Sequence, residues 1–421
     1  MVKLPDNIVR LIVSKIDMSK RIMKAFDSGD NMFITGAAGC GKTFNINQLI
    51  THIKEKELKI GITSSTAASA LLIGGRTVHS YLGIGLGTKE APKLASSLRY
   101  KNKTKYDILR DLDVLIIDEI SLLDADFIDK LSDYLAIVRG KRKVFGGLQI
   151  IFSGDFLQLS PVKSETYAFQ SKAWKLLRLN NIVLTKMMRQ IDDLEFQHIL
   201  EELRFGRCSD AILERLEQLK YTKFEGDIKP TLLYSRNIDV DAINSKQYQK
   251  LVDAGATKKT YTSLKSSHPN VQHWVDSNKF PERIEVCIGA QVILTANVDP
   301  SAGLFNGSRG IVTELGTLGP TVKFVDGREI VIERWMTVSE DNKRLFIECI
   351  PLRLAWCLTI HRSQGMTIDR LVVSLKDCFT YGQAYVAISR ARDLASIKVV
   401  DAQKTSFKCS QEVVDFYKSI M

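Results

Sequence analysis

The residues that point most directly to chemistry form a short loop at 36–43, which reads Gly-Ala-Ala-Gly-Cys-Gly-Lys-Thr. The loop matches the pattern G-x-x-x-x-G-K-[ST] and lies between the apolar run "MFIT" and a helix-like stretch. In such a loop, backbone N–H groups wrap the phosphates of a nucleotide and the helix N-terminus adds a favourable dipole. Lys42 is expected to contact the β- and γ-phosphates, and the Thr43 hydroxyl to coordinate Mg²⁺. The expected phosphate site comprises Gly36, Ala37, Ala38, Gly39, Cys40, Gly41, Lys42 and Thr43.

A pair of carboxylates, Asp118 and Glu119, ends the apolar segment "DVLIIDE". Phosphoryl transfer needs a carboxylate on the metal and a group that orients the attacking water. We therefore expect Asp118 to hold Mg²⁺, directly or through water, and Glu119 to act as the general base. Gln158, in "IIFSGDFLQLSPV", is a candidate sensor of the γ-phosphate or the attacking water. Alone, either segment could be an ordinary polar turn, and the loop at 36–43 favours the catalytic interpretation.

Short apolar runs are expected to position these candidates. The runs at 32–35, 59–63, 114–118 and 148–154 alternate with helix-like stretches. This alternation predicts a parallel β-sheet covered by helices on both faces. Each run ends where polar residues begin, and ligands of such sheets bind at the carboxyl ends of the strands. The polar clusters are therefore expected to converge on one crevice.

The second half of the sequence changes its pattern twice. A further strand is predicted at 231–235, followed by a helix at 237–252. From about 256 to 349, short strands are separated by Gly, Asn-Gly and Asp-Gly turns, which is typical of a small antiparallel barrel or sandwich. The α/β pattern is expected to return after Pro351. The β-rich block therefore reads as an insertion within a second α/β unit.

Composition and charge limit the class of protein. Lys and Arg number 59 against 48 Asp and Glu, a net charge of +11 that fits either a polyanionic partner or a solvated basic surface. No apolar run approaches the roughly 18 residues of a membrane helix. Residues 1–20 are expected to form an amphipathic helix, not a signal or transit peptide. Seven scattered cysteines with no Cys/His cluster indicate reduced thiols, so we expect an intracellular protein, nuclear or cytoplasmic.

Several longer segments identify a family by their order. They are "GAAGCGKT", "TSSTAASALLIGGRTVHSYLGIG", "DEISLLD", "FGGLQIIFSGDFLQLSPV", "LTKMMRQ", "GAQVILTANVD", "PLRLAWCLTIHRSQGMTID" and "GQAYVAISRAR". Together they resemble the Pif1 family of superfamily 1B DNA helicases, from about residue 30 to about residue 400. The resemblance implies ATP as the nucleotide, with Mg²⁺, and ATP-driven movement on single-stranded DNA in the 5′-to-3′ direction.

The resemblance also implies an architecture and a set of partners. The fold class is α/β, with two RecA-like P-loop NTPase domains, a small wedge insertion and an SH3-like β-rich insertion. The first domain is placed at 1–183 with the wedge at about 80–105, the second at 184–255 and 350–421, and the β-rich insertion at 256–349. The implied enzyme is a DNA helicase of replication, repair or recombination. It would act as a monomer on single-stranded DNA and on tailed or forked duplexes, with no membrane partner.

Further site residues are carried over from matching motif positions. Arg189 in "MMRQ" and Arg390 in "AISRAR" match the family's two arginine fingers, which neutralise charge developing at the γ-phosphate. Pairing with a surface carboxylate is the alternative for either arginine. Gly365, in "TIHRSQG", is assigned to nucleotide binding. The residues that match DNA-backbone contacts are Ser65, Thr66, Thr77, His79, Thr359, His361 and Gln364.

Some positions keep another interpretation. His79 could be a satisfied buried histidine, and Tyr81 and Trp356 fit core packing better than base stacking. The basic run at 98–110 is interpreted as an exposed loop beside the wedge. No glutamine precedes the phosphate loop, where helicases of this kind carry one that reads adenine. Ser19 stands near the expected place, so a hydroxyl or backbone contact would replace the amide.

Two rival functions share the same motifs. One is a translocase that strips proteins or anneals strands without separating duplexes, and the other is a clamp that grips nucleic acid while ATP is bound. Glu119 and the two arginines argue against a pure clamp, which has no need of fast turnover. Contacts to the sugar-phosphate backbone do not by themselves exclude an RNA substrate.

Overall fold

A computed structural model describes residues 18–85, 87–161, 164–224, 229–235, 237–278, 280–296, 298–299, 304, 306–339, 343–376 and 378–421. The helix expected at 1–20 lies outside these residues up to position 17, and residues 18–27 are helical. The chain divides into two units. The first unit comprises the described residues of Met1–Phe156, Ser160–Met188 and Phe416–Met421, and the second those of Leu157–Leu159 and Arg189–Asp415.

The first unit is built on a parallel sheet, which has six strands within the described residues. In sheet order they are β3 (Arg76–Thr77), β2 (Ile60–Ser64), β4 (Val114–Asp118), β5 (Gln149–Gly154), β1 (Met32–Gly36) and β6 (Asn180–Leu184). Every neighbouring pair is parallel, so the carboxyl ends of the strands lie at one edge. The parallel sheet predicted from the apolar runs is confirmed.

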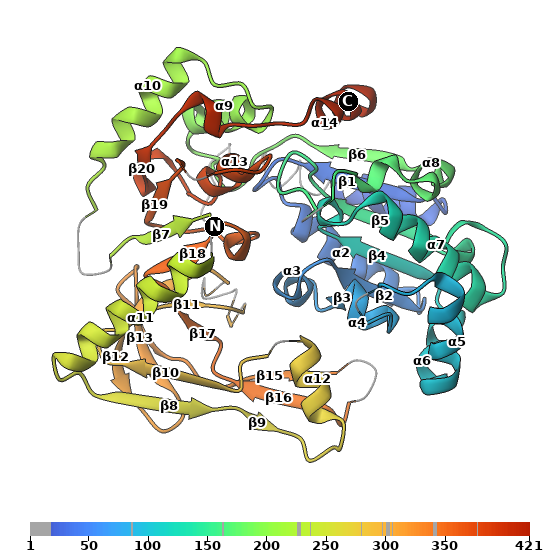
Figure 1. The fold of residues 1–421 in the computed structure, drawn as a ribbon, viewed down its shortest axis with the longest axis horizontal. Helices are drawn as coiled ribbons and strands as arrows, with labels where there is room; N and C mark the ends of the chain where they lie inside the picture. Colours follow the sequence, from blue (N-terminus) through green and yellow to red (C-terminus); the bar gives the residue numbers. More distant parts are fainter. Residues whose placement is uncertain are drawn as a thin grey trace, which may run out of the picture. The chain divides into compact units, whose positions relative to one another are not determined.

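Helices cover this sheet because its strands are apolar on both faces. Helix α2 (Lys42–Glu55) follows β1, and its Leu49 and Ile53 share a core cluster with Ile34 of β1. Successive side chains of a strand point to opposite faces, so Phe33 belongs to the other core. There its ring lies 5.0 Å from that of Trp174 in α8 (Lys172–Leu177), which packs beside α7 (Ala125–Arg139) (Figure 1).

The basic run at 98–110 is helical, so its interpretation as a loop is wrong. It forms the end of α5 (Ala91–Lys101) and all of α6 (Lys103–Arg110), and both helices pack against α7 (Figure 1). The reason lies in the spacing of its apolar residues. Leu94 and Leu98 occupy one buried helical face, and Leu109 is buried on α6. Two shorter helices, α3 (Ala67–Leu72) and α4 (Val78–Leu82), follow β2 and β3.

The second unit contains another parallel sheet. In the part of the chain that the structure describes, its strand order is β18 (Cys357–Thr359), β7 (Thr231–Tyr234), β19 (Leu371–Ser374) and β20 (Ile397–Asp401). The predicted strand at 231–235 and the predicted helix at 237–252 are confirmed as β7 and as α11 (Asn237–Asp253). The helices of this unit are α9 (Leu194–Arg204), α10 (Asp210–Gln218), α11 (Asn237–Asp253), α13 (Gln383–Ile388) and the beginning of α14 (Gln411–Ile420).

The β-rich block is antiparallel, as its turn dipeptides predict. Its largest sheet has the order β14 (Glu329–Val331), β13 (Pro320–Phe324), β12 (Arg309–Leu315), β11 (Gln291–Leu294) and β17 (Leu352–Leu354). Smaller sheets pair β8 (Lys258–Thr262) with β10 (Arg283–Cys287), and β16 (Phe346–Cys349) with both β15 (Trp335–Val338) and β9 (Leu264–Lys265), near α12 (Val271–Asn278). Because β17 pairs with β11, the antiparallel structure continues beyond Pro351, where the sequence pattern placed its end.

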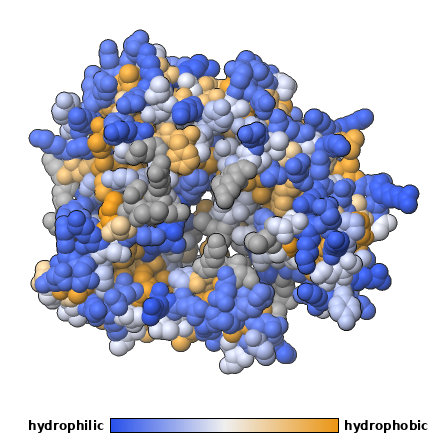
Figure 2. Space-filling view, viewed as in Figure 1, coloured by the Kyte–Doolittle hydropathy of each residue, from blue (hydrophilic) through white to orange (hydrophobic). Residues whose placement is uncertain are grey.

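The surface and the cysteines are ordinary for a globular chain. On the face that Figure 2 shows, hydrophobic side chains are scattered among hydrophilic ones. Among the described residues, none of the helices has both the length and the apolar character needed to cross a membrane. All seven cysteines are free thiols.

Candidate functional site

The predicted phosphate loop is a tight turn between β1 and α2. Gly36 has φ +153, and a Cβ added there would lie 2.3 Å from the Leu184 carbonyl oxygen. Gly41 has φ +86 at the start of α2, a conformation that glycine adopts without steric cost. The backbone of this loop therefore requires glycine at both positions, in agreement with the sequence pattern.

Lys42 is the first residue of α2, and its ammonium group folds back over the loop. Its Nζ donates to the carbonyl oxygens of Gly36 at 2.7 Å and Ala37 at 3.0 Å. A positive charge is thereby held beside the N-terminus of a helix, where free backbone N–H groups also favour anions. Thr43 follows it and is partly exposed.

Asn45 anchors α2 beneath the loop. Its amide nitrogen donates to the Gly41 carbonyl oxygen at 3.0 Å, and its side-chain oxygen accepts from the Ser19 hydroxyl at 2.9 Å. Ser19 is only 9% exposed. Its hydroxyl thus donates beneath the phosphate loop, and the expectation that it replaces an adenine-reading amide stays a prediction.

Asp118 and Glu119 lie at the end of β4. Asp118 is 5% exposed, and burial raises the pKa of its carboxyl group, while the nearby Ser153 side chain, the Glu119 backbone and the charge of Lys42 lower it. Glu119 adopts the left-handed conformation, with φ 52 and ψ 45. That conformation costs a non-glycine residue roughly 1–2 kcal/mol. Strain of this kind concentrates at functional sites, which supports a specific role for the Glu119 side chain.

Ser65 joins the end of β2 to the backbone of Asp118 and Glu119. Its hydroxyl donates to the Glu119 carbonyl oxygen, and its backbone N–H donates to the Asp118 carbonyl oxygen at 3.1 Å. Thr66 and Thr77 are helix N-caps, whose side-chain oxygens accept from backbone N–H groups in α3 and α4. A ligand that contacted Ser65 would therefore touch a residue that is hydrogen-bonded to the backbone of both Asp118 and Glu119.

His79 combines features of both of its interpretations. Its ring stacks on Phe127, with centroids 4.8 Å apart and planes at 23°. Burial lowers the pKa of His79, so the ring is neutral at pH 7. The side chain is nevertheless partly exposed. By contrast, Tyr81 and Trp356 are 5% and 8% exposed, so their predicted core packing is confirmed.

Strand register brings the first-unit candidates to the same edge of the sheet. Ser64 is paired with both Asp118 and Thr77, so the segments that begin with Ser65, Glu119 and Val78 leave adjacent strands. Gly36 is paired with Leu184 on the other side of the sheet. The predicted convergence of polar clusters at the carboxyl ends of the strands is therefore observed within this unit.

In the second unit, Arg189 and Arg390 both contact Ser389. Arg189 donates from Nε to the Thr367 hydroxyl and from Nη1 to the Ser389 carbonyl oxygen, both at 2.8 Å. Arg390 is 2% exposed and donates from Nε to the Val386 carbonyl oxygen at 2.9 Å and from Nη2 to the Ser389 hydroxyl at 2.9 Å. The partners named here are hydroxyl and carbonyl oxygens.

The segment "TIHRSQG" lies beside Arg390. The carbonyl oxygens of Ser363 and Met366 accept from Arg390 at 3.4 and 3.5 Å. Thr359 is 2% exposed, and its hydroxyl accepts from the backbone N–H of Arg362. The candidate residues at its end, His361, Gln364 and Gly365, are exposed or partly exposed.

Gln158 belongs to the second unit although it follows a strand of the first. Its side chain is 4% exposed. Its backbone carbonyl oxygen lies against Gly382, the N-cap of α13, where an added Cβ would be only 2.0 Å away. Helix α13 therefore begins at the contact with Gln158 and ends at Ser389, to which both Arg189 and Arg390 donate hydrogen bonds.

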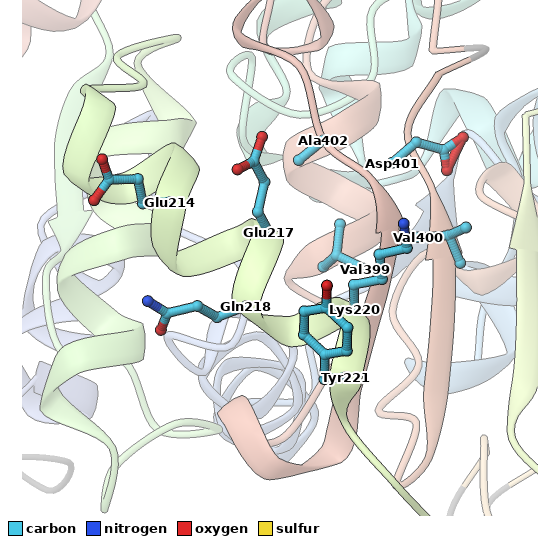
Figure 3. A pocket seen from close by; sticks show the side chains of 9 residues that line it. All are labelled: Glu214, Glu217, Gln218, Lys220, Tyr221, Val399, Val400, Asp401 and Ala402. Atoms are coloured by element: carbon cyan, nitrogen blue, oxygen red, sulfur yellow. The ribbon is translucent and has the colours of Figure 1, made fainter.

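Two features of the structure lie outside the predicted site residues. One is a buried set of hydrogen bonds around Tyr417, described below, which joins residues more than 380 positions apart. The other is a pocket of about 540 Å³ between α10, the short helix at Leu219–Tyr221 and the end of β20 (Figure 3). Its charged lining residues are Glu214, Glu217, Lys220 and Asp401. None of the predicted site residues lines it, and no group of acidic, His or Cys residues suited to a metal is found in the described residues.

Comparisons with known proteins agree with this geometry. The chain is 35% identical over 416 residues to the ATP-dependent DNA helicase PIF1 of Danio rerio, covering 95% of this chain and 63% of that protein. The crystal structure of a Pif1 helicase from Candida albicans matches with 31% identity, full coverage of both chains and a TM-score of 0.78. A Pif1 helicase from Bacteroides in complex with ADP-AlF3 and single-stranded DNA matches with 28% identity, 96% coverage of each chain and a TM-score of 0.67.

The fold and the site together define a P-loop NTPase with RecA-like parallel sheets. A family model described as PIF1-like helicase matches residues 14–213, and one for the 2B domain of DNA helicase Pif1 matches residues 275–315. The chain belongs to the PIF1-like helicase family. It spans about 63% of the length of the zebrafish relative.

Proposed function

We propose that this chain is an ATP-dependent DNA helicase that moves along single-stranded DNA in the 5′-to-3′ direction and separates duplexes during replication, repair or recombination. The observation that carries the proposal is a phosphate loop, a buried Asp118 and a strained Glu119 at one edge of a parallel sheet. Similarity to the zebrafish helicase supports the reaction. Similarity to the Bacteroides complex with ADP-AlF3 and single-stranded DNA supports an adenine nucleotide and single-stranded DNA as ligands. Tailed or forked duplexes are the substrates of unwinding in this proposal.

The first unit supplies the groups for phosphoryl transfer. Backbone N–H groups of residues 36–43 wrap the phosphates, and Lys42 exchanges the carbonyl oxygens of Gly36 and Ala37 for the β- and γ-phosphates. Glu119 orients the attacking water and takes its proton while the water oxygen bonds to the γ-phosphorus. The bond between that phosphorus and the bridging oxygen breaks, and ADP leaves.

The donors at this edge fit Mg²⁺. Thr43 offers a hydroxyl and Asp118 a carboxylate, which are hard oxygen ligands, and Mg²⁺ commonly takes only one or two protein carboxylates. Burial that raises the pKa of Asp118 also makes a neighbouring cation favourable, since the cation stabilises the ionised form. The chemistry that the bound ion supplies is neutralisation of charge on the β- and γ-phosphates.

The second unit supplies sensing groups in this proposal. Gln158 senses the γ-phosphate or the water, Arg189 and Arg390 are the arginine fingers, and Gly365 contacts the nucleotide. Arg189 is partly exposed and donates to the Thr367 hydroxyl and the Ser389 carbonyl oxygen, so it exchanges these acceptors for phosphate oxygens with little rearrangement. Arg390 is almost fully buried and requires its loop at 363–366 to move.

The DNA track in this proposal consists of backbone contacts, so it reads no sequence. The residues assigned to it are Ser65, Thr66, Thr77, His79, Thr359, His361 and Gln364. The proposed domains are 1–183, 184–255 with 350–421, and 256–349, except that Phe416–Met421 pack within the first unit. The proposed active form is a monomer. The antiparallel sheets between β8 and β17 support a separate β-rich insertion.

The test is ATP hydrolysis stimulated by single-stranded DNA. Lys42→Ala should abolish it, because the ammonium group that contacts the β- and γ-phosphates is lost. Lys54→Ala is the matched control, since Lys54 is an exposed lysine of the same helix and should leave the rate unchanged. Substantial DNA-stimulated hydrolysis by the Lys42 variant would overturn the site assignment.

A further inference from the structure

The last six residues of the chain, Phe416–Met421, belong to the first unit although the preceding residues 189–415 belong to the second. Two aromatic side chains hold this segment in place. Phe416 stacks on Phe169, with centroids 4.2 Å apart and planes at 10°, and meets the edge of Phe156 at 5.7 Å. Tyr417 is completely buried. The C-terminal turn of α14 is therefore part of the core of the ATPase unit.

The Tyr417 hydroxyl uses all of its hydrogen-bonding capacity there. It lies 2.6 Å from the Thr35 hydroxyl and donates to the Asp155 carboxylate at 2.9 Å. It also accepts from the backbone N–H of Phe156 at 3.2 Å. A phenol has one hydrogen to donate, and in Tyr417 that hydrogen is bonded to the Asp155 carboxylate. The Thr35 hydroxyl is therefore the donor in its bond with Tyr417.

These three partners lie directly before groups that handle the nucleotide. Thr35 precedes Gly36, the first residue of the phosphate loop. Asp155 and Phe156 begin the segment that reaches Gln158, whose carbonyl oxygen rests on Gly382 at the start of α13. One hydroxyl thus bonds both to the strand that enters the phosphate loop and to the segment that carries the γ-phosphate sensor.

We propose that Tyr417 is a positioning residue for ATP hydrolysis. Its hydroxyl fixes Asp155 and Phe156 relative to the end of β1, and these two residues begin the segment that contains Gln158, the proposed sensor of the γ-phosphate or the attacking water. The proposal rests on the proposed function, because it presumes that hydrolysis uses Gln158. It makes the extreme C-terminus of the chain part of the ATPase machinery, through contacts that lie entirely within the first unit.

A buried phenol can also serve stability alone, and a second tyrosine separates the two roles. Tyr134 is completely buried in the same unit, and its hydroxyl donates to the Leu82 carbonyl oxygen at 2.8 Å. Tyr417→Phe and Tyr134→Phe each remove one hydroxyl and keep the ring. Both variants should lower Tm, but only the first alters the position of residues 155–158.

The experiment measures kcat and KM for ATP, with single-stranded DNA saturating, for the full chain and both variants below their Tm. Tyr417→Phe should lower kcat at least about tenfold, within the 10²-fold that a 1 Å misplacement can cause, and change KM less than about twofold. Tyr134→Phe should keep both parameters. Equal kcat values for the wild type and Tyr417→Phe would overturn the inference, whereas an inactive wild type would overturn the proposed function.

A second variant keeps the test decisive if Tyr417→Phe does not fold. Thr35→Val has nearly the same shape as threonine but lacks the hydroxyl that donates to Tyr417. It should also lower kcat with little change in KM. Combined with Tyr417→Phe, where that protein folds, it should add little further loss, because both changes remove the same hydrogen-bonded unit. A normal kcat for Thr35→Val, or fully additive losses, would contradict the proposal.

Discussion

At Gly382, a single added methyl group should show whether the contact with Gln158 affects ATP hydrolysis beyond its effect on stability. Its φ is +70, and an added Cβ would lie 2.0 Å from the Gln158 carbonyl oxygen and 2.7 Å from that of Leu157. No real side chain tolerates such distances, so Gly382→Ala must displace either residues 157–158 or the start of α13. Both elements lead to groups that we assign to the γ-phosphate.

The cost of Gly382→Ala has two parts. The left-handed backbone costs a non-glycine residue roughly 1–2 kcal/mol. Forcing an extra methyl into packed surroundings costs roughly another 1–3 kcal/mol. The free energy of unfolding should therefore fall by roughly 2–5 kcal/mol. If Gln158 moves by about 1 Å, kcat should fall by up to about 10²-fold.

Gly255→Ala measures the cost of the left-handed backbone conformation alone. Gly255 has φ +89, and an added Cβ there would meet nothing within 4 Å. This control should lose only the roughly 1–2 kcal/mol of the left-handed conformation and keep its kcat. Urea unfolding measures the free energy of unfolding, and DNA-stimulated ATP hydrolysis measures kcat. Both are carried out at about 15 °C, near the temperature at which domains are typically most stable. If Gly382→Ala matched Gly255→Ala in stability and in kcat, the contact between Gln158 and Gly382 would have no functional importance.

Two substitutions and a salt titration test other parts of the proposed site. Because burial raises the pKa of Asp118, ionisation of its carboxyl group costs stability as the pH rises from the ordinary value near 4 through the raised value. Asp118→Asn should therefore abolish hydrolysis yet raise Tm at pH 7.5, and this gain should disappear near pH 3.5. An unchanged or lower Tm at pH 7.5 would contradict this. Ser19→Ala removes the bond to Asn45 beneath the phosphate loop and should raise KM for ATP and GTP by the same factor; a changed ATP-to-GTP ratio would instead make Ser19 a base reader. Affinity for single-stranded DNA should fall steeply between 50 and about 200 mM salt, as expected for phosphate contacts, and a salt-independent affinity would argue against a backbone track.

Much of the first unit could be predicted because its signals are local. The apolar runs that became β1, β2, β4 and β5 carry their own pattern, and parallel pairing then places their carboxyl ends together. The glycine positions of the phosphate loop follow from backbone geometry that glycine alone adopts easily. The residue types at these strand ends were therefore enough to predict the cluster of Lys42, Asp118 and Glu119.

The remaining features depend on contacts that no local pattern records. Tyr417 meets Thr35 across 382 positions, and nothing in "DFYKSI" distinguishes it from an ordinary amphipathic helix. The use of Ser19 by Asn45 likewise appears only when the two helices pack. Residues 98–110 are predicted as an exposed loop because lysines and arginines dominate the run, yet the leucines buried on α5 and α6 have helical spacing.

Unwinding of tailed duplexes tests the central claim most directly. A duplex with a 5′ single-stranded tail and one with a 3′ tail are compared in the presence of ATP, with Lys42→Ala as the inactive control. We expect the 5′-tailed duplex to be opened and the 3′-tailed duplex to remain intact. Opening of the 3′-tailed duplex alone would contradict the direction, and hydrolysis of ATP without opening of either duplex would contradict strand separation itself.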